Sequence, residues 1–385
     1  MHRKLLPMAL TLALLAAISG PARAGVKSKT VYVDDIDAWK VEVFAGASNS
    51  GGLMQGPAIE AGVGGGGSMC FFPTGEGFIA AEGVVMTLGR DEARTVRFLA
   101  GTPGVPGYAD GPASQALLGR QISITPDGKG GLWIGDRTNR CVRRLTKKDD
   151  AWVVETVAGD PAKPGWGREP TDGTGKDAVF KYLHSNVAAD AEGNAYIIDR
   201  NFLRRIAPEG KAETLNPGGG SGKPGDGALE GARFNLIMGG GLCLGGDGCL
   251  YVADRWNHCI RKVDLAAKTV STVVGPGRGY VDGPQDACGF HDSPGHIVWD
   301  PWRKRFNTNG VDDWGVRVWQ DGWMRTIAGG GRSNKAMEGP ARKAGIHWGG
   351  TRAIDPMPPH DIYFWSNGGG WRGRIGRLYK EGGNP

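Results

Sequence analysis

The chain has 385 residues, with 67 glycines, 23 prolines and a formal net charge of +6. The glycines do not recur at every third position, which excludes a collagen-like triple helix. The charge is small for this length and forms no dense basic stripe, which argues against a nucleic-acid-binding protein.

Residues 1–24 have the features of a cleaved secretory signal, with a basic start, an apolar run and small residues at the end. Its removal takes away Arg3, Lys4 and Arg23, so the net charge falls from +6 to about +3. No later segment is apolar over the ~18 residues that a membrane helix needs. The sequence therefore predicts an exported protein, secreted or periplasmic, that does not insert into a membrane.

Six related units follow in residues 27–382, each about 57 residues long. In the second unit, the strand-like stretches QISIT, LWIGD, CVRRL and WVVETVAG are separated by turn residues, and a loop of the form DGTGKDA follows. No run has the period of a helix. This order predicts an all-β fold, a six-bladed β-propeller of four-stranded antiparallel blades in a single domain. The units close on Gly46, Gly101, Gly159, Gly219, Gly275 and Gly329.

The two ends of the chain complement each other. The sixth unit stops at EGGNP without an outer strand, whereas the N-terminus carries a spare strand, WKVEVFAG. We expect this N-terminal strand to complete the last blade, because a ring closed in this way leaves no open sheet edge.

The stretches GNAYIIDRNFLRRI and GCLYVADRWNHCIRKV, with the DG loops, resemble NHL repeats over nearly the whole of residues 27–382. NHL repeats form six-bladed propellers in secreted enzymes and in many binding proteins. The resemblance therefore implies a six-bladed propeller, and it leaves open whether the chain is an enzyme or a binding protein. Three units depart from the pattern, with Glu82, Asn309 and Asn367 near the place where the other units carry aspartate.

An Asp-Arg pair recurs after the second strand of units 2, 3 and 4. Aspartate and asparagine at a tight turn accept hydrogen bonds from the backbone N–H groups that follow, so we interpret these residues as structural. They are Asp136, Asn139, Asp199, Asp254 and Asn257.

The arginines of these pairs are candidate ligand-binding residues, since they should lie on the same face as the DG loops. An arc of guanidinium groups suits carboxylate or sulfate, and solvated surface charge is the alternative. The arginines are Arg137, Arg200 and Arg255. Tryptophans could offer platforms for sugar rings or side chains, unless they pack between blades. These are Trp256, Trp314 and Trp348.

Alternation along the innermost strands predicts which residues line the central channel. Small or polar residues occupy the positions that face the axis. These are Ser68, Cys70, Gln121, Ser123, Asn186, Ala188, Gly241, Cys243, His296, Val298, Thr351 and Ala353. We take Gln121, Asn186, His296 and Thr351 as candidate ligand-binding residues. Arg352 stands where the other strands have an apolar residue that packs between blades.

His184 and His296 lie at entries to inner strands, and His291 and His347 lie in the loops before such strands. Imidazoles that converge on one channel mouth can hold zinc. LHSNVAAD is similar to the histidine-bearing strand entry of the peptidyl-hydroxyglycine amidating lyases, propeller enzymes with a channel zinc, but the other histidines have different offsets. Gluconolactonases are similar propellers that hold a divalent ion by acidic and amide side chains at strand entries, where this chain has mostly glycine.

Six cysteines in an exported protein suggest oxidation, and Cys259 and Cys288 are the best candidates for a disulfide. Cys70 and Cys243 should face each other across a channel too wide for a bridge.

The favoured function is an exported, monomeric binding propeller. Its partner would be an acidic peptide, a polysaccharide or another exported protein, held at the loop-rich face and the channel mouth. The alternative is a metal-dependent lyase or hydrolase at that mouth. A divalent cation is the one cofactor that the sequence suggests, either zinc at His184 and His296 or calcium held by carbonyl oxygens of the glycine-rich ring.

Overall fold

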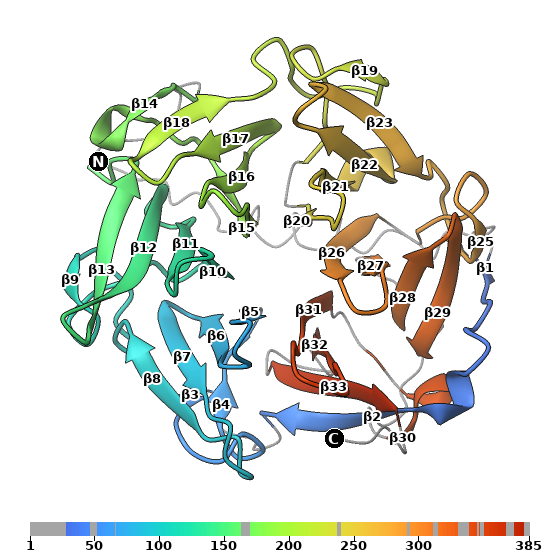
Figure 1. Cartoon of the computed structure of the whole chain (residues 1–385), viewed down its shortest axis with the longest axis horizontal. Coiled ribbons are helices and arrows are strands. Elements are labelled where there is room, and N and C mark those ends of the chain that lie inside the picture. Colours follow the sequence, from blue (N-terminus) through green and yellow to red (C-terminus); the bar gives the residue numbers. More distant parts are fainter. Residues whose placement is uncertain are drawn as a thin grey trace, which may run out of the picture.

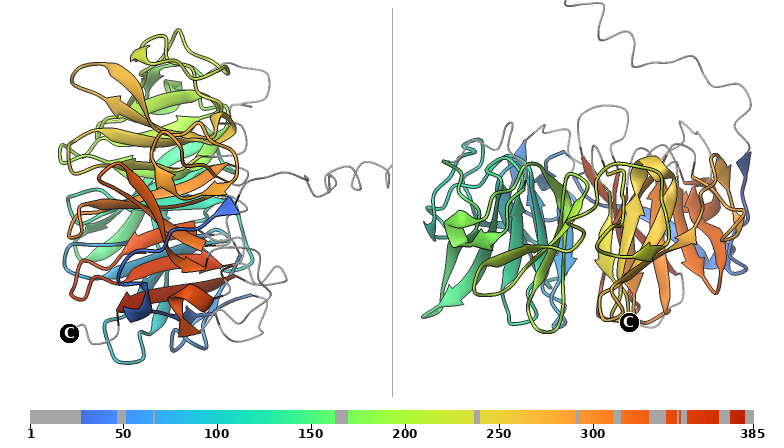
Figure 2. Two further views of the ribbon diagram at one scale, coloured as in Figure 1. Left: turned by 90° about the vertical axis from the view of Figure 1, so that its right-hand side faces the viewer. Right: turned by 90° about the horizontal axis from the view of Figure 1, so that it is seen from above.

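The computed structural model describes residues 28–46, 52–65, 67–162, 170–236, 240–290, 293–310, 315–329, 339–344, 346, 350–366 and 373–380. Six sheets stand around a central axis like the blades of a propeller (Figure 1). Figure 2 shows the same ring from the side as a thick disc. The predicted six-bladed, all-β fold is confirmed. No helix of the described residues is long and apolar enough to cross a membrane.

Each blade has four antiparallel strands, which are named below in order from the axis outward. Blade 1 has β5 (Ser68–Phe71), β6 (Gly77–Ala81), β7 (Val84–Leu88) and β8 (Val96–Ala100). Blade 2 has β10 (Ile122–Pro126), β11 (Leu132–Asp136), β12 (Cys141–Lys148) and β13 (Ala151–Ala158). Blade 3 has β15 (Leu183–Ala189), β16 (Ala195–Asp199), β17 (Phe202–Ile206) and β18 (Lys211–Thr214).

The second half of the ring repeats this order. Blade 4 has β20 (Leu242–Leu244), β21 (Leu250–Asp254), β22 (Cys259–Asp264) and β23 (Thr269–Val274). Blade 5 has β26 (Pro294–Asp300), β27 (Arg305–Gly310), β28 (Gly315–Gln320) and β29 (Trp323–Gly329). Blade 6 has β31 (Gly350–Ile354), β32 (Ile362–Ser366), β33 (Arg374–Lys380) and, as its outer strand, β2 (Trp39–Ala45).

Short two-residue strands complete the described sheet structure. Five come from the DG loops and pair with the outer strands of blades 2 to 6, so those sheets have five strands where the sequence predicted four. They are β9 (Gly111–Pro112), β14 (Gly173–Thr174), β19 (Gly227–Ala228), β25 (Gly283–Pro284) and β30 (Gly339–Pro340). Outside the blades, β1 (Ser28–Lys29) pairs with β24 (Tyr280–Val281), and β3 (Leu53–Met54) pairs with β4 (Gly62–Val63).

Helical structure in the described residues is limited to four three-residue 3-10 segments. They are η1 (Ile36–Ala38), η2 (Gly175–Asp177), η3 (Arg255–Asn257) and η4 (Ala341–Lys343).

The N-terminal strand closes the ring, as the sequence predicted. Strand β2 pairs antiparallel with β33, from Trp39 opposite Lys380 to Ala45 opposite Ile375. In Figure 1 this strand, near the start of the chain, lies beside the last strands of the sequence. Trp39 is buried in the cluster that blades 5 and 6 share. The last blade therefore depends on residues that the chain supplies first.

The hydrophobic core of the described residues is divided among the gaps between neighbouring blades. One cluster, for example, joins Val142 of blade 2 to Val187 and Ile197 of blade 3. Another joins Ile260 of blade 4 to Ile297 of blade 5. Each blade is thus held on both faces by its neighbours, which is how a short sheet with two apolar faces gains its stability.

The Asp-Arg turns are structural, as predicted, and they also fix the strand entries. Asp136 is fully buried, and its carboxylate accepts hydrogen bonds from the backbone N–H of Asn139 and of Gly119, each at 3.0 Å. Asp199 accepts from the backbone of Tyr182 at 2.7 Å, and Asp254 from that of Asn235 at 2.8 Å. The loop before each inner strand is therefore pinned to the turn of the same blade.

A buried arginine holds each DG loop of blades 2 to 5 against its blade. The sequence alone had suggested no structural role for these loops. In blade 2, Arg143 of β12 donates to the carboxylate of Asp110 at 2.7 Å and to the carbonyl of Leu117 at 2.7 Å. Thr156 of the outer strand donates to the same carboxylate through its backbone N–H and its hydroxyl. The fully buried arginines at this position are Arg143, Arg204, Arg261 and Arg317, and their loop partners are Asp110, Asp172, Asp226 and Asp282.

Candidate functional site

The inner strands enclose a cavity of about 340 Å³ on the propeller axis. The predicted axis-facing residues in its wall are Ser68, Cys70, Asn186, Ala188, Cys243, His296, Val298 and Ala353. The wall also contains residues from the far ends of the inner strands, which were not among the sequence candidates. These include Thr125, Pro126, Leu244, Trp299, Pro301, Trp302 and Ile354. We call the end of the channel where the inner strands begin the entry end, and the other the exit end.

Irregularities in three inner strands decide which side chains reach the axis. The pairing register shifts between Leu183 and Val187 in β15, between Pro294 and His296 in β26, and between Thr351 and Ala353 in β31. An extra residue in one strand re-aims the side chains around it.

Arg352 is the clearest case, because it occupies the extra position in β31 and lines the cavity. Alternation assigns this position to the side that packs between blades, and the shift in register turns Arg352 toward the channel instead. Strict alternation holds only when the register is continuous.

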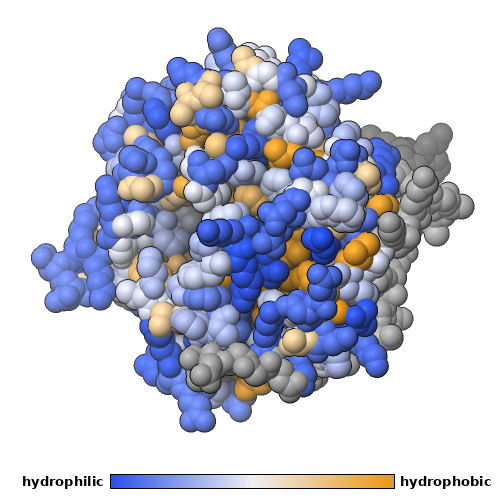
Figure 3. All heavy atoms as spheres, turned by 45° about the vertical axis from the view of Figure 1, so that its right-hand side comes forward, coloured by the Kyte–Doolittle hydropathy of each residue, from blue (hydrophilic) through white to orange (hydrophobic). Residues whose placement is uncertain are grey.

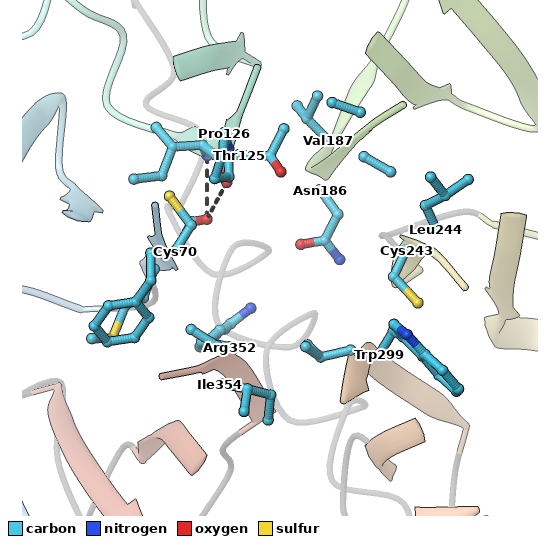
Figure 4. A pocket seen from close by; sticks show the side chains of 18 of the residues that line it. Cys70, Thr125, Pro126, Asn186, Val187, Cys243, Leu244, Trp299, Arg352 and Ile354 are labelled. Atoms are coloured by element: carbon cyan, nitrogen blue, oxygen red, sulfur yellow. Dashed lines mark hydrogen bonds between the residues drawn. The ribbon is translucent and has the colours of Figure 1, made fainter. Parts of the chain in front are cut away.

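Arg352, His296 and Asn186 form the polar wall of the cavity. Figure 4 shows Asn186 and Arg352 pointing toward the middle of the ring from opposite sides. A guanidinium nitrogen of Arg352 lies 2.9 Å from Nδ1 of His296, and the amide nitrogen of Asn186 lies 3.5 Å from the same atom. Because arginine is always a donor, Nδ1 of His296 accepts and the ring carries its proton on Nε2.

The environment of His296 keeps its ring neutral. Burial lowers the pKa of His296 well below the usual value, and the nearby positive charges of Arg352 and Arg255 lower it further. The geometry of the hydrogen bond and the direction of this pKa shift agree. His296 is thus a neutral group with its Nε2–H free to donate to a ligand, as far as the described residues show.

Arg352 is a half-buried cation in the channel wall without a carboxylate partner among the described residues. Burial lowers the pKa of Arg352 to about 10, and no acidic group acts on it in the opposite direction. Its Nε has no hydrogen-bond partner among the described residues. The side chain stays charged at neutral pH, so the channel presents an unpaired positive charge.

Two of the three predicted arginines reach the entry of the following blade. The guanidinium of Arg137 lies 4.3 Å from the centre of the Tyr182 ring, beside His184. Nε of Arg255 donates to the hydroxyl of Ser293 at 3.3 Å, near His296. Both arginines add positive charge close to the entry end of the channel.

Arg200 departs from this pair because its turn is shorter. Asp199 pairs directly with Phe202, which leaves a two-residue turn, whereas Asp136 pairs with Cys141 across four residues. Arg200 adopts a left-handed conformation with φ of 59° and is exposed. The predicted arc of three equivalent guanidinium groups is reduced to two.

The other candidates lie as follows. Gln121 is exposed at the start of blade 2, and Ser123 is fully buried, and neither is in the cavity wall. Trp256 is 42% exposed on the entry-face turn of blade 4. The candidates outside the described residues are Trp314, Trp348, His291, His347, Asn367 and the side chain of Thr351.

The two histidines proposed as metal ligands differ in surroundings. His184 is buried at the entry of blade 3, where burial and the charges of Arg137 and Arg255 lower its pKa to about 3. His296 contacts Arg352 instead. Within the described ranges, no three His, Cys, Asp or Glu side chains are gathered as metal ligands would be.

The expected disulfide between Cys259 and Cys288 is wrong, since both cysteines are free. The thiol of Cys288 donates to the carbonyl of Gln285 at 3.4 Å. Cys259 begins β22, next to the buried Asp254, whose charge raises the pKa of its thiol in addition to the effect of burial. Sequence position placed both cysteines near the junction of blades 4 and 5, but it could not give the direction of the side chains.

Comparisons with known proteins support the repeat and the fold. No family model matches the chain. It is 32% identical over 168 residues to NHL repeat-containing protein 2 of Bos taurus, which covers 40% of this chain and 22% of that protein. The chain thus spans about a fifth of the length of this curated relative. The resemblance to NHL repeats is confirmed by this similarity together with the six-bladed fold.

Two solved structures from Bacteroides are similar over most of the ring. One is an auxiliary nutrient binding protein from Bacteroides ovatus, with a TM-score of 0.60 and 14% identity, covering 89% of this chain and 77% of that one. The other is a putative phosphatase from Bacteroides thetaiotaomicron, with a TM-score of 0.59 and 12% identity, covering 90% and 79%. At these identities the likeness concerns the fold alone.

Proposed function

We propose that this protein is an exported ligand-binding propeller that holds an anionic group of an acidic ligand in its central channel, at Arg352. The observation that carries the proposal is the guanidinium of Arg352, which lines the cavity without a carboxylate partner among the described residues. Withdrawing a charge from water is costly unless it is paired, so a half-buried arginine without a carboxylate partner among the described residues is poorly explained by stability alone.

The neighbours of Arg352 suit an anion. The guanidinium has donors left after its contact with His296, and Nε2 of the neutral His296 is a further donor. A ligand carboxylate would accept from several of these groups, and hydrogen bonds between ionised partners are the stronger kind. Arg137 and Arg255 would draw an acidic ligand toward the entry end through their longer-range field.

The class of ligand follows from this charge and agrees with a binding role. An acidic polysaccharide or an acidic peptide would satisfy Arg352, whereas a cation would be repelled by the three arginines near the channel. One of the similar solved structures is described as a nutrient binding protein, which fits a propeller that binds without catalysis. Export is proposed from residues 1–24.

The test compares binding of polygalacturonate, poly-glutamate and neutral dextran by isothermal titration calorimetry. We expect an acidic polymer to bind and dextran not to. Arg352→Met should weaken binding on the order of tenfold or more, which corresponds to at least ~1.4 kcal/mol. The control is Arg205→Met, because Arg205 forms a surface ion pair with Glu213 away from the channel and such pairs contribute little.

Thermal unfolding of the same variants separates binding from folding. Arg352→Met should melt at the same temperature as the parent or higher, because it removes a half-buried charge that has no carboxylate partner among the described residues. Unchanged affinity for the acidic polymers in Arg352→Met would overturn the proposal. A melting temperature several degrees lower would assign Arg352 a structural role instead.

The alternative, a metal-dependent lyase or hydrolase, is favoured by His184 and His296 alone. A catalytic zinc needs three protein ligands and an open position, and positive charge from arginines lies beside both histidines. We expect less than one zinc per chain in the purified protein by elemental analysis. Stoichiometric zinc that is lost in His184→Ala or His296→Ala would establish the metal site.

A further inference from the structure

The cavity is elongated and extends from the polar wall toward the exit end. In β26 its lining runs from His296 through Val298 and Trp299 to Pro301 and Trp302 in the turn beyond. The stretch from His296 to Asp300 alone spans about 13 Å at ~3.3 Å per residue. A ligand that touches both ends must therefore be longer than a single sugar ring.

Trp302 stands at the exit end with a large exposed aromatic surface. It is 41% exposed, and it lines the cavity. Its indole stacks on the ring of His360 from the exit turn of blade 6, with ring centres 4.2 Å apart and planes 15° apart. Hydrophilic residues cover much of the face seen in Figure 3. Trp302 is one of three tryptophans of the described residues that are about 40% exposed, with Trp256 and Trp323, and of these three it is the one that lines the cavity.

The position of Trp302 is fixed by hydrogen bonds in the two exit turns. Its backbone N–H donates to the carboxylate of Asp300 at 3.2 Å. The next residue, Arg303, donates to the same carboxylate at 2.9 Å and to the backbone carbonyls of His360 and Pro359 at 2.9 and 3.0 Å. The tryptophan is therefore held in place before any ligand arrives, which lowers the entropy cost of binding.

The cavity wall between these two ends has one charge and several short polar groups. Among the described residues that line it, Arg352 is the charged one, and none is an aspartate or a glutamate. Hydroxyl and amide side chains are provided by Ser68, Thr125 and Asn186. A rigid exposed indole at one end with an arginine at the other matches an apolar ring face on one ligand unit and a carboxylate on a unit further along the ligand.

We infer that the channel binds the end of an oligosaccharide that carries uronic acid, entering from the exit face, with a sugar ring against Trp302 and a carboxylate on Arg352. The inference rests on the proposed function and adds the direction of entry and the class of ligand. It differs from the prediction from sequence, which placed the ligand on the entry face with Trp256 as a platform.

The test titrates a galacturonic acid trimer, its methyl ester and a glutamate trimer into the full-length protein by calorimetry. We expect the free acid to bind, the uncharged ester to bind at least tenfold more weakly, and the peptide to bind more weakly than the sugar. Trp302→Ala should weaken binding of the trimer at least tenfold. The matched control is Trp323→Ala, since Trp323 is 39% exposed at the start of the outer strand of blade 5 and does not line the cavity.

The outcomes separate this inference from the proposed function. If Arg352→Met loses the trimer and Trp302→Ala does not, the anion site stands and entry from the exit face is overturned. A loss in Trp256→Ala without a loss in Trp302→Ala would place the ligand on the entry face. Tighter binding of the glutamate trimer than of the sugar acid would overturn the assignment to uronic acids. Equal affinity of Arg352→Met and the parent would end both proposals.

Discussion

Single residues in this propeller take their roles from what surrounds them more than from their type. The aspartates that follow the second strands are conventional surface residues by composition, yet Asp136 is fully buried and holds two backbone N–H groups. His184 and His296 are neutral because they are buried beside arginines. The hydrogen bonds of Asp136 and the neutral state of the two histidines therefore depend on neighbours from other parts of the chain.

The neutral histidine at 184 predicts a loss of stability in acid. The pKa of His184 is about 3 in the folded protein and about 6.5 in the unfolded chain, so the unfolded state binds more protons between these values. Stability contributed by the neutral ring is complete above pH ~6.5 and falls by up to ~1.4 kcal/mol per pH unit as the pH drops toward 3. We expect His184→Gln to flatten the pH dependence of the free energy of unfolding, measured by urea denaturation between pH 4 and 7.

The control for this measurement is Lys129→Gln, which removes an exposed charge that forms no ion pair among the described residues. Its curve should keep the slope of the parent. An equally steep slope in His184→Gln would show that other groups cause the loss of stability in acid.

Among the structural elements, the pair of a buried arginine and a DG-loop aspartate recurs in blades 2 to 5, and we call this pair the clamp. The aspartate of the clamp is buried to a different degree in different blades. In blade 5, Asp282 and Arg317 are both fully buried, and the aspartate also accepts from the hydroxyl of Thr326 at 2.6 Å. In blade 4, Asp226 is 56% exposed beside the buried Arg261. The clamp joins the DG loop, the third strand and the outer strand, so it fixes how one blade leads to the next.

The two clamps give a matched pair of variants. Asp282→Asn should lower the free energy of unfolding by about 3–5 kcal/mol, because it removes the charge that compensates a buried arginine. Asp226→Asn should cost less than about 1 kcal/mol, since water screens the exposed partner. Chemical denaturation of both variants measures the difference. Equal costs would mean that burial of the aspartate does not control the strength of the clamp.

For the whole molecule, ring closure is the feature on which the other contacts depend. The core of the described residues lies between blades, so every blade needs both neighbours. Blade 6 is completed by β2, which pairs with β33 over most of its length and buries Trp39. Loss of this strand would expose an edge of blade 6 and uncover the cluster shared with blade 5.

Deletion of residues 30–46 tests this dependence. We expect the shortened protein to lose cooperative thermal unfolding or to aggregate, because blade 6 lacks its outer strand. Deletion of residues 103–105, which form an exposed turn before blade 2, should lower the melting temperature by only a few degrees. The two proteins are compared by circular dichroism and by resistance to trypsin. A folded, protease-resistant ring without residues 30–46 would refute closure by β2.

The number of blades, their strand order and the way in which the ring closes could all be predicted from the sequence. These features repeat along the chain, and local turn chemistry sets each of them. A single sequence therefore contains six copies of the same pattern of strands and turns. The structural role of Asp136 and its equivalents was predictable for the same reason. Much of the channel lining also followed, because alternation holds wherever the strand register is continuous.

The candidate site, in contrast, depends on contacts that appear only in the folded ring. One extra residue in β31 turns Arg352 into the channel, and alternation has no means of locating such a shift. The stacking of Trp302 on His360 joins turns of two different blades, and the free state of Cys259 and Cys288 depends on side-chain directions across a blade junction. Contacts of this kind are set by how neighbouring blades pack, which each blade's own sequence does not specify.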